Sequence, residues 1–243
     1  MSPTFTIAKR EFRSYFDSPL AYVVICLSLL MLGVSVFIWN KFWQVDRATL
    51  ASMFQSIPYG LSVLIVPVVT MRLVAEEKRS GTLEMLITLP VRDSDVILGK
   101  FLGALGLVLV LIASTLAYPL LMFTFVWHLG PLDQGPVLSG YVGIVLFSAA
   151  TVALGLLVSS LTESQVIAFF VTFILLVTLL FVGDIAQHVP NVLGTVFREI
   201  SFKEHFIPFE RGLIDTRDVV FFISCAVLAL MFAFRSLESR KWA

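Results

Sequence analysis

Apolar residues gather along the chain in long uncharged blocks, not in the short periodic runs of a soluble core. Lipid offers backbone groups no hydrogen-bond partner, so a block of roughly 20 residues predicts a helix that crosses about 30 Å of hydrocarbon. Six blocks can be identified: Leu20–Trp39, Ile57–Met71, Phe101–Trp127, Val137–Leu161, Val166–Gly183 and Val219–Phe234. The second and sixth are short, so we expect them to recruit Ser52–Ser56 and Thr216–Asp218 from their flanks.

Composition agrees with the block pattern. Hydrophobic residues make up 58% of the 243 positions and charged residues only 14%. No internal repeat or low-complexity tract divides the chain. The sequence therefore predicts an all-α integral membrane protein with six transmembrane helices and a single domain over residues 1–243.

The basic residues are unevenly distributed between the two sides of the membrane. Six crossings place both termini on the same side, and that side then holds eleven of the 17 Lys and Arg residues. Loops rich in Lys and Arg stay in the cytoplasm. We expect both termini to be cytoplasmic, in a multi-pass protein of the bacterial inner membrane.

The first 18 residues have the pattern of an amphipathic helix. Phe5, Ala8, Phe12 and Tyr15 recur at helical spacing, with basic residues on the other faces. Such a helix suits the inner membrane surface, although a solvated tail with some aromatic residues is the alternative. We refer to this segment as the elbow.

The most highly charged run of the chain lies in the predicted cytoplasmic loop 72–100. There Gly81 can end a helix in a left-handed conformation, and a short helix is predicted over Thr82–Leu89. Its apolar positions, Leu83, Leu86 and Ile87, form a stripe of about two turns. The stripe could rest in lipid at the interface, or it could insert into a groove on a cytosolic partner.

Two further connections are informative. The short inner turn holds Thr162 and Gln165 in capping-box spacing, with Glu163 as its only charge. The outer segment 184–218 is too long for a bare connection, and its periodicity predicts short amphipathic or re-entrant helices. Aromatic and charged residues mix near its end and suit a gate or a docking surface for an outer partner: His205, Phe206, Phe209 and Arg211.

Several chemistries are disfavoured. The six blocks contain no Asp, Glu, Lys, Arg or His, which argues against ion-coupled transport. HExxH, GxSxG and Walker A patterns do not occur, and the two cysteines have no metal-like spacing. A net charge of zero argues against nucleic-acid binding. We therefore expect no catalytic, metal or cofactor site, and any ATP must be bound by another chain.

One stretch carries a resemblance to a known family. Residues 72–86, RLVAEEKRSGTLEML, followed by Pro90 and by Leu98-Gly99-Lys100, resemble the inner-loop signature of type-2 ATP-binding-cassette (ABC) permeases. Residues 201–206, 209–212, 214–215 and 237–242 are similar to the permeases of gliding-motility and nitrous-oxide-reductase-maturation systems. The family implies a cytosolic ATPase dimer that binds ATP and Mg²⁺, and a second copy or a sister permease in the membrane.

The resemblance implies a role for the predicted inner-loop helix. It would be a coupling helix, with Leu83, Leu86 and Ile87 as anchors in the ATPase groove. The residues expected to contact the ATPase are Glu76, Thr82, Leu83, Glu84, Met85, Leu86, Ile87, Thr88 and Glu163. ATP-driven export is the favoured function. The alternatives are a mechanical subunit that passes motion to an outer partner without moving a solute and, less favoured, a membrane-embedded enzyme.

Overall fold

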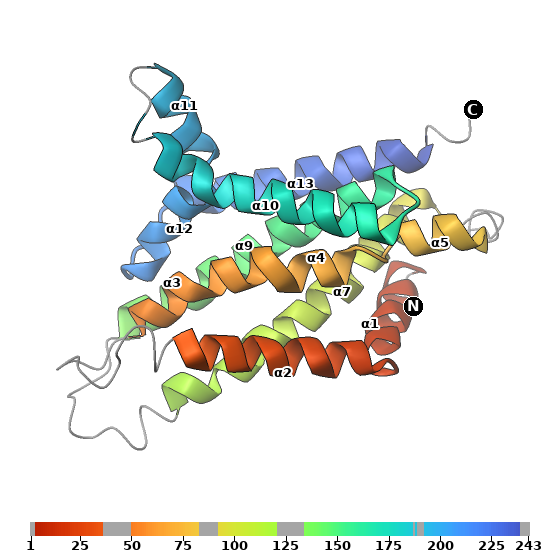
Figure 1. The fold of residues 1–243 in the computed structure, drawn as a ribbon, viewed down its shortest axis with the longest axis horizontal. Coiled ribbons are helices and arrows are strands. Elements are labelled where there is room, and N and C mark those ends of the chain that lie inside the picture. Colours follow the sequence, from red (N-terminus) through yellow and green to blue (C-terminus); the bar gives the residue numbers. More distant parts are fainter. Residues whose placement is uncertain are drawn as a thin grey trace.

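Helices make up the regular structure of the computed structural model, which describes residues 3–35, 50–82, 92–120, 134–186, 188 and 192–238 (Figure 1). Those ranges contain no strand, so the predicted all-α class is confirmed for them. The helices are α1 (Pro3–Phe16), α2 (Pro19–Val34), α3 (Ala51–Gly60), η3 (Leu61–Ile65), α4 (Val66–Thr70), α5 (Ala75–Ser80), α7 (Asp93–Thr115), α9 (Gln134–Leu161), α10 (Gln165–Ala186), α11 (Val192–Ile200), α12 (Phe202–Glu210) and α13 (Thr216–Glu238).

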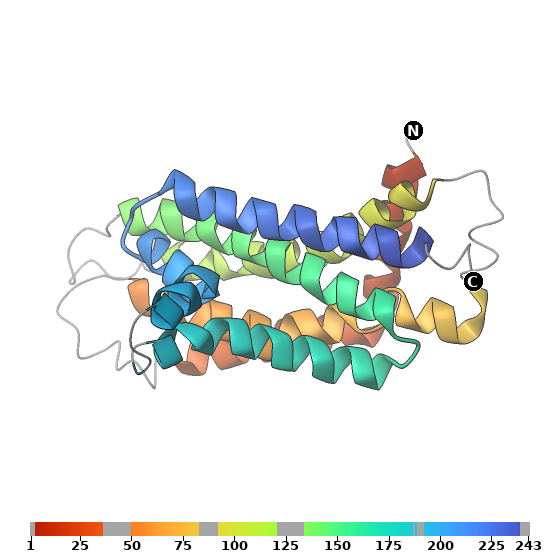
Figure 2. The same ribbon diagram turned by 90° about the horizontal axis from the view of Figure 1, so that it is seen from above.

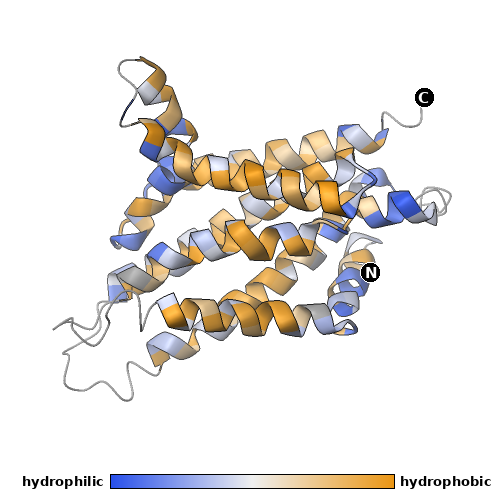
Figure 3. Ribbon diagram, in the orientation of Figure 1, coloured by the Kyte–Doolittle hydropathy of each residue, from blue (hydrophilic) through white to orange (hydrophobic). Residues whose placement is uncertain are grey.

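The predicted crossings correspond to long apolar helices that run side by side (Figures 1 and 2). Within the described ranges, five helices are long and apolar enough to span a membrane, and α1 with α2 forms a bent pair that raises the number to six. Figure 3 shows hydrophobic residues along these helices and hydrophilic residues gathered towards the ends of the bundle. The short second and sixth blocks do recruit their flanks, since their helices begin by Met53 and at Thr216.

The elbow is present as a helix of its own. α1 covers Pro3–Phe16, and the chain then bends by 71° before continuing along α2. Pro19 stands at the first position of α2, where a backbone N–H has no acceptor within the helix, so proline loses no hydrogen bond there. The predicted separation of an amphipathic elbow from the first crossing is therefore confirmed.

The second span is irregular because of its prolines. Pro58 lies inside α3, and Pro67 follows the π-helical segment η3. Each proline removes an amide donor from the helical ladder, and the wider turn of η3 is one way in which a helix absorbs such a defect. Beyond Thr70 the hydrogen-bond pattern is interrupted at residues 71–74 before α5 resumes.

The third span differs from its predicted boundaries. α7 begins at Asp93, eight positions before the predicted start at Phe101, so Lys100 lies inside the helix. The α-helical pattern breaks at Leu116, three residues before Pro119, where the missing N–H and the ring of a proline disturb a helix. Residues 121–127 of the predicted block lie outside the described residues.

The hydrophobic core runs through the bundle, and one part of it lies where α9 meets α12 and α13. The ring of Phe147 in α9 packs against Phe202 and Phe206 of α12 and Phe222 of α13, with centroid distances of 5.8 to 5.9 Å. α9 is mostly buried, whereas α10 and α13 turn most of their apolar side chains outward. The two ends of the bundle differ: one carries α11 and α12, and the other carries α1 and α5 (Figure 1).

Candidate functional site

The short helix α5, which we call the stalk, leads into the segment predicted to couple to an ATPase. It comprises Ala75–Ser80 and projects from the bundle at the end that also carries α1 (Figure 1). Gly81 ends it in the left-handed conformation, with φ of 70°, as predicted from the sequence. The hydroxyls of Ser80 and Thr82 lie 2.9 Å apart, and each donates to the carbonyl oxygen of Glu77. The end of the stalk is therefore stabilised by its own side chains.

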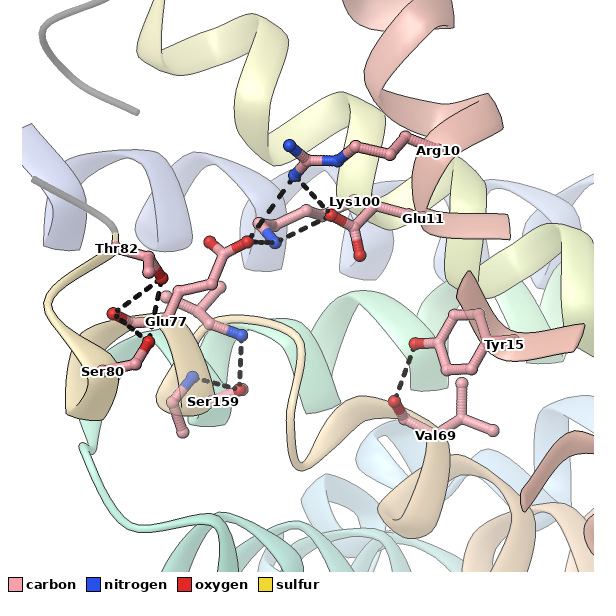
Figure 4. A network of polar contacts seen from close by, with 11 residues as sticks. Arg10, Glu11, Tyr15, Val69, Glu77, Ser80, Thr82, Lys100 and Ser159 are labelled. Atoms are coloured by element: carbon pink, nitrogen blue, oxygen red, sulfur yellow. Dashed lines mark hydrogen bonds and ion pairs between the residues drawn. The ribbon is translucent and has the colours of Figure 1, made fainter. Parts of the chain in front are cut away.

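One serine of α9 holds the beginning of the stalk. The backbone N–H groups of Val74 and Ala75 both donate to Oγ of Ser159, each at 3.1 Å (Figure 4). That hydroxyl donates to the carbonyl oxygen of Met71 at 3.3 Å. A hydroxyl offers one donor and two acceptor sites, so Ser159 is fully used. Because Ser159 is completely buried, these bonds form away from water. The irregular residues 71–74 are thereby fixed to α9.

Tyr15 of the elbow also contacts the chain at this irregular stretch, through Val69 and Arg72. Its hydroxyl donates to the carbonyl oxygen of Val69 at 2.9 Å, and its ring is buried (Figure 4). The guanidinium group of Arg72 lies 5.1 Å from the centre of the ring, in a cation–π contact. The last turn of α4 therefore contacts the elbow before the chain enters the stalk.

An ion cluster joins the stalk, the elbow and α7. Nζ of Lys100 lies 2.7 Å from Oε1 of Glu77 and 3.2 Å from Oε1 of Glu11, and the Lys100 side chain is only 1% exposed. Arg10 reaches the same two carboxylates, at 3.0 Å from Glu11 and 3.7 Å from Glu77, from an exposed position. Figure 4 shows these four side chains converging from three helices. Separating Lys100 from this cluster would leave the two carboxylates with the exposed Arg10 as their cation, which favours the assembled cluster.

Close backbone packing brings the elbow to α7. A Cβ atom added at Gly99 would lie 2.7 Å from Cβ of Ile7, and one added at Gly103 would lie 2.6 Å from Cβ of Glu11. Only glycine allows the two helices to approach this far. The Thr4 hydroxyl also donates to Asp95 at 2.7 Å. The elbow is thus docked on α7 along its length as well as through its charges.

A carbonyl group at the end of α9 connects the stalk to α13. Nζ of Lys78 donates to the carbonyl oxygen of Ser160, and the Ser236 hydroxyl donates to the same oxygen at 3.2 Å. The stalk therefore contacts α1, α7 and α9 directly and α13 through a shared acceptor. A displacement of the stalk would therefore act on α1, α7, α9 and α13.

The structure describes only part of the predicted ATPase-contacting set. Glu76 and Thr82 are exposed at the stalk, and Glu163 is exposed in the turn between α9 and α10. Leu83, Glu84, Met85, Leu86, Ile87 and Thr88 lie outside the described residues. The predicted capping box in the turn is wrong in its details, because Ser164 caps α10: its hydroxyl accepts from the N–H of Ile167 at 3.5 Å, and Thr162 accepts from Ser164 instead.

The predicted outer residues separate into two groups. Phe206 and Phe209 are almost fully buried, and His205 is only 7% exposed, so these side chains belong to the interior of the chain. Their spacing places them on the face of α12 that packs against α9 and α13. Arg211, by contrast, is exposed. The aromatic and charged residues that alternate along this segment therefore belong to an amphipathic helix, whose aromatic side chains are on the buried face.

His205 forms a buried side-chain contact with α13. Its Nδ1 lies 2.6 Å from Oδ1 of Asp218 in α13, and its Nε2 lies 3.1 Å from the carbonyl oxygen of Glu199. The ring also stacks on Phe221, with centroids 3.8 Å apart. This pair fixes α12 to the start of α13.

Sequence reasoning missed most of the polar cluster. Lys100 was placed just outside an apolar block, and Glu11, Glu77, Tyr15 and Ser159 had no assigned partners. The signal that could have identified Lys100 is its position beside Gly99, directly before a span, where a cation needs a nearby carboxylate.

The arrangement defines a multi-pass α-helical membrane protein with a polar junction at the base of a loop between its second and third spans. Residues 46–235 match the family described as ABC-2 family transporter protein, and this region is well over half of the chain, so the chain belongs to that family. It is a membrane permease of an ABC-2 type transporter. The family's membrane domain has no ATPase domain of its own and binds no cofactor, which implies a separate ATPase partner. No curated protein matches the chain.

Proposed function

We propose that a cytosolic ATPase displaces the stalk through the adjoining segment 83–91, and that the stalk transmits this displacement to α1, α7 and α9. The observation that carries this proposal is the cluster of Lys100, Glu77 and Glu11, which joins three helices at the base of that segment. A rigid junction transmits displacement, whereas a freely hinged one would absorb it. The coupling helix would occupy Thr82–Thr88, with Leu83, Leu86 and Ile87 as its anchors.

The proposed role of the stalk sets the orientation of the protein and its other contacts. Both termini and the stalk would face the cytoplasm of a bacterial cell, with the protein in the inner membrane. Glu76 and Glu84 would pair with basic residues of the ATPase, and Glu163, which is exposed at the same end, would add a second contact. The outward-facing apolar sides of α10 and α13 would meet lipid and a second permease copy or a sister permease.

We further propose export as the direction of transport, in a system similar to those of gliding motility or nitrous-oxide-reductase maturation. The support is the similarity in residues 201–206, 209–212, 214–215 and 237–242. In such a transporter, movement of the stalk would rotate the second and third spans and open a path between the two permease copies.

The test is to replace one anchor by a charge. In the permease–ATPase complex, Leu83→Asp should abolish co-purification of the ATPase, or uncouple ATP hydrolysis from the permease, because a carboxylate cannot enter an apolar groove without a large desolvation cost. Membrane insertion should be unchanged. Unaltered ATPase association and activity would refute the assigned role.

A matched control is available at the opposite end of the bundle. Leu213 is 63% exposed in the turn between α12 and α13, so Leu213→Asp makes the same chemical change far from the stalk. It should leave both ATPase association and ATP hydrolysis as in the unmodified complex. Equal effects of the two variants would point to a general membrane-insertion defect.

A second candidate function is supported by α11. Its side chains Val192, Leu193, Val196 and Ile200 are 44% to 76% exposed, on a helix that stands away from the bundle (Figure 1). Such a face suits an outer protein partner in a subunit that passes on motion without moving a solute. Leu193→Asp would then release an outer partner while leaving ATPase association intact. In an exporter that works without such a partner, Leu193→Asp would have no effect on transport.

A further inference from the structure

A large cavity lies between α2, α3, η3 and α7, towards the end of the bundle that carries α11 and α12. Its volume is about 540 Å³, within the range of small-molecule sites in proteins. Its walls include Leu32 of α2, Ile65 of η3 and Leu111 of α7. It lies far from the polar junction at the stalk, so the proposed function makes no use of it.

The hydroxyl groups of the cavity wall already have partners. Ser28 donates to the carbonyl oxygen of Val24 at 2.5 Å, and Thr115 donates to that of Ile112 at 2.7 Å. Ser35 and Ser56 bond to each other at 2.8 Å. The wall therefore presents little unmet hydrogen-bonding capacity to an occupant. Cavities of this kind stay free of water but take up apolar molecules.

The cavity opens at the membrane-facing surface. Met31 of α2 and Val63 of η3 both line it, and they are also 53% and 39% exposed. The opening therefore lies between these two helices, at a depth where the surroundings are hydrocarbon. The hydroxyl pair of Ser35 and Ser56 lies beside the end of α2, so the cavity is apolar in depth and more polar towards one end.

We propose that this cavity binds one acyl chain of a membrane lipid, which enters sideways between Met31 and Val63. The chain fills the apolar depth, and the polar part of the lipid stays at the end marked by Ser35 and Ser56. The argument rests on the size of the cavity, the satisfied hydroxyls and the opening towards lipid. It does not depend on the proposed function and would hold for any activity of the permease.

Gly60 offers a means of closing the cavity without disturbing the helix. It lines the cavity, has helical φ and ψ of −60° and −42°, and a Cβ atom added to it would meet nothing within 4 Å. Gly60→Ala should be tolerated, since alanine is a better helix former than glycine. Gly60→Leu and Gly60→Phe add progressively more side chain into the same space.

The experiment uses photo-crosslinking in lipid nanodiscs. The full chain is placed in phosphatidylcholine that contains a fraction of phosphatidylcholine with a diazirine at the end of one acyl chain. After irradiation, labelled residues are mapped by mass spectrometry. Labels should concentrate on residues such as Leu32 and Ile65, above the level on the lipid-facing Phe170 and Ile174 of α10, and should be displaced by unlabelled phosphatidylcholine.

The variants decide the outcome. The excess labelling should persist in Gly60→Ala, fall in Gly60→Leu and be lost in Gly60→Phe, while labelling of α10 stays constant. Equal labelling of the cavity and α10, or an excess that Gly60→Leu and Gly60→Phe leave unchanged, would overturn the proposal. It would also be overturned if Met31→Cys formed disulfides between two copies while the cavity stayed unlabelled, because a second copy would then cover the opening.

Discussion

Nζ of Lys100 lies 2.7 Å from Oε1 of Glu77, although the two residues stand on opposite sides of the loop between the second and third spans. This contact closes the loop at its base and ties the stalk to α7. Glu11 joins the same ammonium group from the elbow, so three segments distant in sequence share one buried cation.

The first prediction concerns that cation. Lys100→Met should reduce the free energy of unfolding, by less than the about 3–5 kcal/mol of a fully isolated buried pair, because Glu11 and Glu77 lose their buried cation but keep the exposed Arg10. Lys100→Arg keeps the charge and should be milder. The measurement is denaturant-induced unfolding in detergent, with ATP hydrolysis by the complex followed in parallel.

A double-mutant cycle separates charge from packing. Glu77→Gln combined with Lys100→Met should destabilise less than the sum of the two single changes, because the pair is removed together. Strict additivity of the two effects would contradict a direct interaction between these side chains.

The second prediction concerns the serine that holds the stalk. Ser159→Ala should cost about 1–2 kcal/mol, as for a lost helix cap, since two N–H groups lose their acceptor. It should also increase hydrogen exchange at Val74 and Ala75. Ser224→Ala is the matched control, because Ser224 is exposed on α13 and bonds only within its own helix; that change should leave exchange at the stalk unaltered.

The third prediction is a pH dependence at the end of the bundle that carries α11 and α12. Burial raises the pKa of the Glu210 carboxyl to about 7. The folded state therefore favours the protonated form, and the contribution of Glu210 to stability falls as the pH rises from about 4.5 to about 7. A fully buried group with this shift would lose about 3 kcal/mol. Solvent screening at this partly exposed position reduces the loss to about 1 kcal/mol.

Glu210→Gln tests this dependence. The variant should gain little at pH 4 and gain most above pH 7, as measured by thermal unfolding in detergent. Glu199→Gln should behave in the opposite way, because its hydrogen bond with Arg217 lowers the pKa of Glu199, and the benefit of that carboxylate is present at neutral pH and lost as the pH falls. A gain from Glu210→Gln that does not vary with pH would be inconsistent with the burial argument.

The fourth prediction concerns the pair of His205 and Asp218. His205→Ala leaves the buried Asp218 carboxyl group without its hydrogen-bond partner and should cost about 1–3 kcal/mol. Replacing both residues by leucine should restore much of this loss, since an apolar pair leaves no buried polar group unsatisfied. Unfolding of the single and double variants provides the measurement, and a double variant no better than His205→Ala would exclude the pair as the cause.

The fold was largely predictable because the requirements of lipid are simple. A membrane span needs a long uncharged run of residues, and the helices observed at the six apolar blocks follow from that requirement. The exceptions have local causes. Lys100 lies inside α7 because its charge is compensated by Glu11 and Glu77, which a hydropathy pattern does not reveal.

The site was less predictable because its contacts join residues that lie far apart in sequence. Ser159 is separated from Val74 by 85 positions, and nothing near either residue indicates the other. In α12, composition was misleading: Phe206 and Phe209 lie among charged residues in sequence, but helical geometry turns them inward. The left-handed Gly81 was predictable, because it depends only on its own backbone.

The docking of the elbow on the glycines of α7 has a consequence for biosynthesis. The elbow is made first, but its binding surface at Gly99 and Gly103 leaves the ribosome only some ninety residues later. During that interval the nascent elbow has no α7 to pack against, and its aromatic side chains would keep it at the membrane surface. Insertion of the third span would then capture it, so assembly of the amino-terminal end is completed only after the loop that follows the stalk has been translated.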